Sequence, residues 1–250
     1  MTENKSFFKA MTILGLLLAL GMASAAFILG VQAKRAVSGQ QSITVKGLAE
    51  KPIQADSADW TIQVSVYGRT QATALQSASK TRRVVEAFLT KQDFEKSAWT
   101  VDVETIEPHY VELYDPNYRR VQQGYEAHQN IRVVSSDLAK IKTANKAILQ
   151  LRADNQPIIA HSPKYLVSNL EDIKMSLIAD ATKNARRRAI EFVKQDGATV
   201  GVMKSAKQGT FSILALGGNG DGDNSYGGVY DKSTIDKTAR VVVTIVYNIE

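Results

Sequence analysis

Residues 168–197, SNLEDIKMSLIADATKNARRRAIEFVKQDG, contain the clearest secondary-structure signal in the chain. Ser168 and Glu171 have the spacing of a capping box at a helix N-terminus, and Gly197 is a typical C-terminal stop. Between them, apolar side chains recur at helical spacing along one stripe, which comprises Ile173, Leu177, Ala181, Ala185, Ala189, Phe192 and Val193. This pattern predicts a long amphipathic helix that must pack against another layer.

The segments before this helix carry both strand and helix signals. Residues 60–66 alternate apolar and polar side chains, as in a half-buried strand, and a second alternation begins at Trp99. We expect that second strand to run to about residue 113. A turn at Asp115–Asn117, where proline pre-sets the backbone, would then lead into a return strand at 125–134. These residues therefore predict a β-hairpin.

Two more helices are expected, at 71–91 with Leu75 on its inward face and at 137–151 with Leu149 on its inward face. The remaining extended stretches are 43–53, as a bent strand or a strand pair, followed by 157–167, 200–207, 210–216 and 239–249. Strands and helices interleave irregularly, with a hairpin among them. This order predicts an α+β fold, in which antiparallel sheets pack against about three amphipathic helices. No second linker divides residues 42–250, so we expect one domain.

The N-terminus carries an apolar segment. Residues 10–33 contain no charged side chain, and a helix of about 20 residues crosses the hydrocarbon core of a membrane. Lys5 and Lys9 precede the run, as expected for residues 1–9 on the cytoplasmic side. Two interpretations stay open: an uncleaved anchor, or a signal peptide cut after Ala25 in an A-x-A pattern. Apolar residues continue past Ala25, which favours the anchor, and 34–41 would form a linker.

Both interpretations place the following residues outside the cytoplasm, and we expect them in the periplasm, attached to a bacterial inner membrane. Composition excludes several other classes. There is no cysteine, so no disulfide, thiolate metal site or cysteine nucleophile exists. Half of the net charge of +6 belongs to residues 1–35, and the rest has 27 basic and 24 acidic residues. This near balance gives no nucleic-acid footprint.

Three stretches invite a functional interpretation. His109 and His128 would approach each other if the hairpin pairs about its centre; two imidazoles bind Cu²⁺ or Zn²⁺ when further ligands complete the site. We expect them to be solvated strand residues, and we predict no metal site or cofactor. Arg186, Arg187 and Arg188 form a candidate interaction patch for anionic lipid or an acidic partner, or else the solvated side of a helix.

The glycine-rich stretch 217–228 fits neither a phosphate loop, because a strand and not a helix follows it, nor an EF-hand, because Tyr226 and Lys232 occupy the positions that need glycine and an acid. A surface loop is the better interpretation. The sequence also lacks G-x-S-x-G, H-E-x-x-H and Walker A motifs. We therefore predict no catalytic residue and a protein that is not an enzyme.

Several stretches together resemble the SIMPL-domain family of bacterial envelope proteins, and their order carries the resemblance. They are ITVKGLA at 43–49 with Ala55-Asp56 after it, IEPHY at 106–110, Ala181-x-x-x-Ala185-Arg-Arg-Arg-Ala189 leading to Gly197 and the Val-Gly-Val step at 200–202, and VVVTI at 241–245. The resemblance implies an exported α+β domain, ring-like or channel-like oligomers in some members, and a role linked to oxidative or envelope stress. It implies no catalytic residue.

Overall fold

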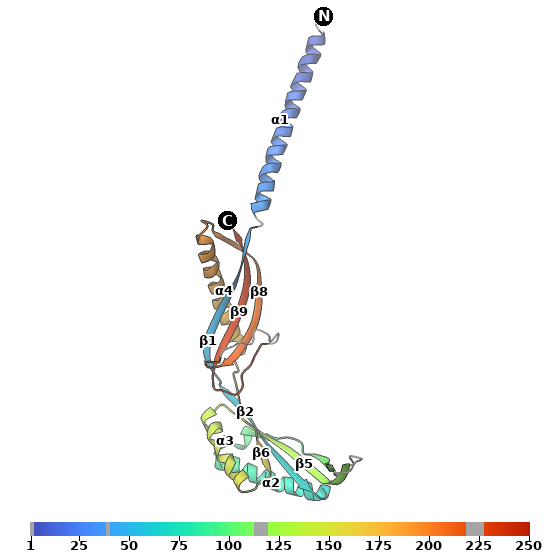
Figure 1. The fold of residues 1–250 in the computed structure, drawn as a ribbon, viewed down its shortest axis with the longest axis vertical. Coiled ribbons are helices and arrows are strands. Elements are labelled where there is room, and N and C mark those ends of the chain that lie inside the picture. Colours follow the sequence, from blue (N-terminus) through green and yellow to red (C-terminus); the bar gives the residue numbers. More distant parts are fainter. Residues whose placement is uncertain (1–2, 39–40, 113–119, 219–227) are drawn as a thin grey trace. The chain divides into compact units, whose positions relative to one another are not determined.

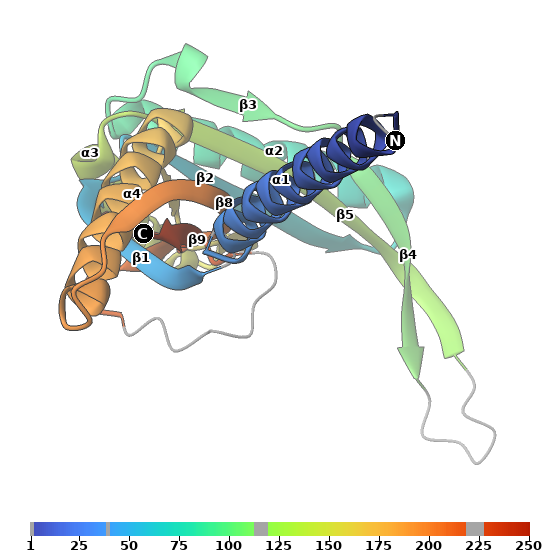
Figure 2. The ribbon, with the colours of Figure 1, turned by 90° about the horizontal axis from the view of Figure 1, so that it is seen from above.

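The structure is a computed structural model, and it describes residues 3–38, 41–112, 120–218 and 228–250. The fold is α+β, as expected, with two antiparallel sheets (Figures 1 and 2). In chain order the elements are α1 Glu3–Ser38, β1 Ser42–Gln54, β2 Ser57–Gly68, α2 Gln71–Lys91, the 3₁₀ turn Lys96–Ala98, β3 Trp99–Val101, β4 Thr105–Glu112, β5 Arg120–Ser135, α3 Leu138–Ala153, β6 Ile158–Ala160, β7 Lys164–Leu166, α4 Leu170–Lys194, β8 Val200–Ala215 and β9 Asp236–Ile249.

The apolar segment forms most of α1. Met11–Gln32 is long and apolar enough to cross a membrane, and none of its side chains is buried by the rest of the chain. A helix that is hydrophobic on all sides and left uncovered satisfies its backbone internally but exposes its side chains to the surroundings. These properties suit a membrane anchor or a signal sequence.

The chain divides into two compact units. The first comprises Met1–Ala49, Ser176–Thr210 and Val241–Glu250, and the second comprises Glu50–Met175 and Phe211–Arg240. The small sheet has the order β1-β9-β8, and its three long strands contribute residues to both units. Our treatment of 42–250 as one domain stays a prediction.

The second unit is built on the larger sheet, whose central strands are β2 and β5. They pair antiparallel over eleven positions, from Ala58 opposite Ser135 to Gly68 opposite Tyr125. One face of β2 is buried under α2 and α3, through Trp60, Ile62, Val64 and Val66. The Trp60 indole N–H donates to the carbonyl of His161 at 2.9 Å, so its polar atom is satisfied in the core. The alternation in the sequence therefore predicted this face correctly.

The helix bounds at 71–91 are confirmed, and their start has a local cause. The Thr70 hydroxyl accepts a hydrogen bond from the Thr73 N–H at 3.2 Å, and the Thr73 hydroxyl accepts one from the Thr70 N–H at 3.1 Å. This reciprocal cap satisfies two donors that a helix start leaves free. The inward residue is Ala74, and the expectation for Leu75 is wrong, since it lies on the exposed side. Leu149 of α3 is likewise exposed.

The helix α4 lies along the small sheet in the first unit (Figure 1). Its predicted apolar stripe is buried from Ile173 to Val193, with one exception: Phe192 is 65% exposed. The capping box is also wrong. The Ser168 hydroxyl donates to the Asp56 carboxylate at 2.6 Å instead of capping the helix, whose first turn is closed by the bond from the Ile173 N–H to the Asn169 carbonyl. Gly197 ends the helix region with a φ of 70°, as predicted.

Some strand boundaries differ from expectation. The predicted strands 200–207 and 210–216 are one continuous strand, β8. The strand expected from Trp99 is instead two, β3 and β4, both paired with β5. The turn at Asp115–Asn117 lies outside the described residues, as does most of the 217–228 loop. Figure 2 shows β4 and β5 running side by side toward that hairpin end.

Candidate functional site

The exposed face of the hairpin carries the two histidines. In the register of β4 and β5, Thr105 lies opposite His128 and His109 lies opposite Gly124, with Glu107 opposite Glu126 between them. Opposed residues in an antiparallel pair point to the same side, so these side chains share the face turned away from the buried core. The two histidines are thus offset along the hairpin and not directly opposed.

A single carboxylate joins them. The Glu126 Oε2 atom lies 3.7 Å from His109 Nδ1 and 3.9 Å from His128 Nε2. The Ser65 hydroxyl donates to Glu126 Oε1 at 3.3 Å, and the Tyr67 ring meets the His109 ring edge-on, with centroids 5.2 Å apart. When an imidazole is protonated, its contact with Glu126 becomes an ion pair.

This cluster does not amount to a metal centre. Across residues 11–32, 41–112, 120–218 and 228–250, no group of three or more His, Cys, Asp or Glu side chains is arranged to hold a metal ion. Both separations from Glu126 also exceed the roughly 3.4 Å that separates two ligands about 2.1 Å from a tetrahedral Zn²⁺. His109, Glu126 and His128 therefore form a cluster of polar contacts on the face of the sheet turned away from the core.

The arginine run of α4 divides into three different environments. Arg188 Nη1 donates to the backbone carbonyl of Lys46 at 3.3 Å. The Arg186 guanidinium lies over the Tyr247 ring, 5.8 Å from its centroid, in a cation–π contact. Arg187 is exposed, and its side chain lines a shallow depression with Ile190. The run is therefore partly structural, and the sequence pattern alone did not distinguish its members.

Asn184 and Arg188 of α4 cover backbone groups on one edge of the small sheet. The strand β1 is an edge strand, and its Leu48 N–H donates to the Asn184 Oδ1 atom at 3.2 Å, next to the Arg188 contact with Lys46. Unpaired backbone groups along an edge recruit other strands unless something covers them. Asn184 and Arg188 supply that cover for β1.

The opposite edge, β8, is more open. Val202 and Met203 are 67% and 45% exposed, and every residue from Val202 to Thr210 is exposed. Within the described chain, the backbone pairing on its outer side involves Ile213, whose N–H donates to Val229 and whose carbonyl accepts from Asp231. Lys204 and Lys207 also lie in this strand, a common device that limits unwanted pairing.

A buried ion pair in the second unit was not anticipated from the sequence. The Lys237 side chain is fully buried, and its Nζ atom donates to Asp231 Oδ2 at 3.1 Å and to the Asp231 carbonyl at 2.7 Å. Burial raises the pKa of Asp231, but hydrogen bonds from Ser233, Thr234 and Lys237 outweigh it and hold the pKa well below its usual range. Lys237 precedes the strand predicted at 239–249, so the apolar alternation did not mark it as buried.

Asp56, part of the family resemblance, has a structural partner. Hydrogen bonds from the Ser168 hydroxyl and N–H lower its pKa, more than burial raises it.

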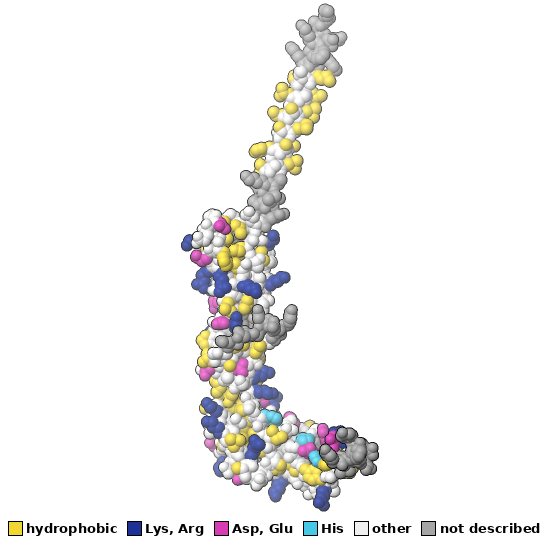
Figure 3. All heavy atoms as spheres, in the orientation of Figure 1, with side chains coloured by type: hydrophobic (Ala, Val, Ile, Leu, Met, Phe, Trp, Pro, Cys, Tyr) yellow, Lys and Arg dark blue, Asp and Glu magenta, His cyan; other side chains and the backbone are white. Residues whose placement is uncertain are grey.

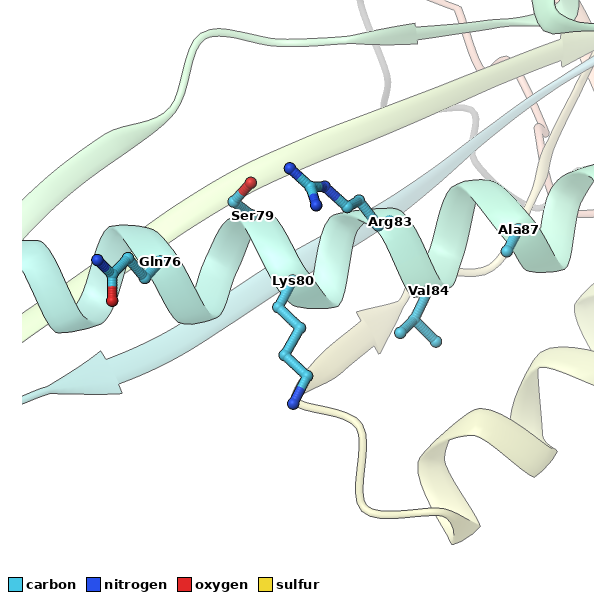
Figure 4. A pocket seen from close by; sticks show the side chains of 6 residues that line it. All are labelled: Gln76, Ser79, Lys80, Arg83, Val84 and Ala87. Carbon is cyan, nitrogen blue, oxygen red and sulfur yellow. The ribbon is translucent and has the colours of Figure 1, made fainter.

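The surface also has a groove along the outer side of α2 (Figure 4), lined by Gln76, Ser79, Lys80, Arg83, Val84 and Ala87. All six come from one helix and include neither an imidazole nor a carboxylate.

Curated proteins and solved structures have little likeness to this chain. No curated protein matches it significantly. Among solved structures, an uncharacterized conserved protein from Listeria innocua is similar over 78% of this chain and 91% of its own, with 10% identity and a TM-score of 0.21. A putative aminohydrolase from methicillin resistant Staphylococcus aureus is similar over 76% of this chain and 41% of its own, with 11% identity and a TM-score of 0.22. Neither likeness is close enough to carry an argument.

A comparison with protein-family sequences shows which family the chain belongs to. The family described as SIMPL, protein of unknown function (DUF541), matches residues 43–245, which is most of the chain and nearly all of it after the apolar helix. The resemblance in the order of the four sequence stretches is thereby confirmed. The chain belongs to the SIMPL family.

Proposed function

We propose that this protein is a non-enzymatic, membrane-anchored SIMPL protein, with its folded part outside the cytoplasm. The observation that carries the proposal is Met11–Gln32, whose mean hydropathy of 2.3 and lack of any burial suit lipid and not water. Lys5 and Lys9 precede the span, but Lys34 and Arg35 follow it and weaken the charge asymmetry. The resemblance to exported SIMPL proteins therefore supports a cytoplasmic N-terminus, with β1 and all that follows in the periplasm.

We also propose that the anchored chain assembles into homo-oligomers. The open β8 edge supports this, because an exposed edge with apolar side chains is a surface on which a second strand can add. The cover of Asn184 and Arg188 on β1 directs such pairing to β8. Pairing of β8 with β8 of a second copy gives a two-fold, self-complementary contact.

The non-enzymatic role is supported by the kind of surface depressions the described residues form. The α2 groove in Figure 4 has the side chains of one helix only, and the depression on α4 is lined by Asn184, Arg187, Arg188, Ile190, Glu191 and Phe192. Ser79 and Lys80 of the α2 groove point to different sides of the helix, and the α4 depression has no hydroxyl or imidazole, so neither presents the nucleophile–base pair that activates a hydroxyl. A role in oxidative or envelope stress follows from the family resemblance, and we propose it on that basis.

A fusion of alkaline phosphatase to the C-terminus tests the location. This enzyme is active only where its disulfides form, so we expect activity in cells and a fusion that stays in the membrane fraction at alkaline pH. An inactive fusion would contradict export. An active fusion released by alkali would contradict anchoring but not export.

The absence of native cysteine allows a clean test of assembly. Ser205→Cys lies in the exposed part of β8, and we expect it to form disulfide-linked dimers of the full-length protein in the membrane. Ser77→Cys, on the exposed side of α2, is the matched control and should stay monomeric. Equal dimer yields, or none for Ser205→Cys together with a monomer mass in detergent, would contradict pairing through β8.

A further inference from the structure

The end of the first unit that joins the anchor exposes both basic and apolar side chains. Nine residues separate Gln32, at the end of the apolar span, from Ser42, at the start of β1. Six of them continue α1, so helical and extended rises together allow at most about 25 Å between the two points. If the helix is anchored, as proposed above, the start of β1 stays close to the lipid headgroups at any helix angle.

Hydrogen bonds identify which other segments lie at that end. The Gln41 carbonyl accepts from the Ile249 N–H at 3.0 Å, and the backbones of Thr199 and Glu250 exchange two hydrogen bonds of 2.7 and 2.9 Å. The start of β1, the start of β8 and the C-terminus therefore lie together. We call this region, with the last two turns of α4 (residues 187–194), the membrane-proximal end.

The orientation of α4 follows from its contacts with β1. Asn184 contacts Leu48, and one turn later Arg188 contacts Lys46. Moving toward the C-terminus of α4 thus means moving toward the start of β1. Residues 187–194, the last two turns of the helix, lie at the membrane-proximal end.

Three large apolar side chains are exposed at this end. Phe192 is 65% exposed, Ile190 43% and Val202 67%. Phe192 belongs to the helix stripe by sequence but does not join the core, so its exposure has no packing explanation in the first unit. Exposed aromatic and branched side chains next to cations are typical of surfaces that rest on a bilayer.

The charge of the same region has the sign that anionic lipid requires. Residues 186–204 contain five basic and two acidic residues, although the chain after residue 35 is nearly balanced. Figure 3 shows Lys and Arg side chains gathered over the region of α4 and the small sheet. The acids in or next to this region are Asp180, Glu191, Asp196 and Glu250, one fewer than the cations of 186–204. The Asp180 carboxylate lies 3.8 Å from the Lys183 ammonium, one turn further along the helix.

We infer that the membrane-proximal end docks on the anionic lipid headgroups of the membrane that holds α1. Arg187 and Lys194 contact the phosphate groups, and Phe192 and Ile190 enter the interface between headgroups and acyl chains. This contact rests on the proposed anchoring and adds to it: a second attachment that holds the first unit against the bilayer and restricts its rotation about the linker. The occupant is lipid, because the tether keeps lipid within reach at all times.

A tryptophan at the proposed contact provides the test. The full-length Phe192→Trp variant is reconstituted in vesicles of phosphatidylcholine alone or mixed equally with phosphatidylglycerol, each containing brominated lipid that quenches tryptophan at the bilayer. We expect quenching in the anionic vesicles, weaker by about threefold or more in the neutral ones and in the anionic vesicles after Arg187→Glu and Lys194→Glu. Gln208→Trp, in the exposed middle of β8, is the control for background from Trp60 and Trp99.

Each other outcome would overturn the inference. Equal quenching of the Phe192→Trp variant in both vesicles would exclude recognition of anionic lipid. No quenching above the Gln208→Trp control, with the protein still in the vesicle fraction, would exclude docking and leave anchoring intact. Protein that fails to stay with the vesicles would overturn anchoring and docking together. A lipid-independent, concentration-dependent change in the tryptophan emission of the Phe192→Trp variant in detergent would identify a second copy as the occupant.

Discussion

Gly47 and Ala181 are so close that a Cβ atom added to Gly47 would come within 2.1 Å of the Ala181 carbonyl oxygen. The contact presses the edge strand β1 against α4, and the neighbouring Lys46 and Leu48 backbones are bonded by α4 side chains. A glycine in a strand often marks such a close backbone approach. Gly47 lies in the ITVKGLA stretch of the family resemblance, so packing explains that residue.

Gly47→Ala should therefore destabilise the first unit. Because the clash is with backbone, which cannot rotate away, we expect a loss of about 1–3 kcal/mol in the free energy of unfolding. Denaturation of the full chain in detergent, followed by circular dichroism, measures it. Gly21→Ala is the control, since its Cβ meets nothing within 4 Å. Equal stability of the two variants would show that β1 and α4 do not meet as described.

Replacing Asp231 alone should lower the free energy of unfolding more than replacing both Asp231 and Lys237. Asp231→Asn leaves the fully buried Lys237 cation without its counter-charge, and we expect a loss of about 3–5 kcal/mol in the free energy of unfolding. Adding Lys237→Met to Asp231→Asn should recover a large part of this loss, because the unpaired charge is gone. Chemical denaturation of the full chain compares the variants. A double variant as unstable as the single one would contradict this role of the pair.

Asp231 should also make the free energy of unfolding depend on pH in the acid range. Its pKa in the folded protein lies below the 3.8 of an unperturbed Asp, so the unfolded chain takes up the proton first as the pH falls. The stabilisation is complete above about pH 5 and is lost progressively below the unfolded pKa; Asp56 acts in the same direction. The difference in unfolding free energy between the wild type and Asp231→Asn should shrink in acid. A constant difference down to about pH 3 would contradict it.

The cover on the β1 edge gives a prediction about self-association. Asn184→Ala removes the acceptor for the Leu48 N–H, and we expect a loss of about 1 kcal/mol in unfolding free energy together with larger assemblies, because an open edge now exists on both sides of the small sheet. Mass measurement of the full chain in detergent reads the second effect. Arg187→Ala is the matched control on the same helix and should change neither quantity.

Local signals in the sequence predicted the elements well. The alternation at 60–66 predicted the buried face of β2, the helix at 71–91 has the expected bounds, and Gly197 ends the α4 region as expected. Such signals succeed because the period of apolar residues is a direct consequence of one-sided burial. Errors arose where a tertiary partner decided the outcome: the Ser168 hydroxyl binds Asp56, which lies far away in sequence, and so does not cap the helix.

The candidate sites depended even more on tertiary structure. The offset of His109 and His128 around Glu126 follows from a register that the hairpin sequence does not specify, since a shift of one residue moves each side chain to the other face. The separate environments of Arg186, Arg187 and Arg188 depend on where β1 and β9 pass α4. Periodicity shows which side of a helix is polar, but not which polar residue has a partner.

The intact mass of the protein extracted from its membrane distinguishes an anchor from a cleaved signal peptide. An uncleaved anchor predicts the full chain of 27.4 kDa, with or without the initiator methionine. A mass that corresponds to a chain beginning at Ala26 would show that the apolar helix is cut after Ala25. The anchor, and the lipid contact that depends on it, would then be wrong.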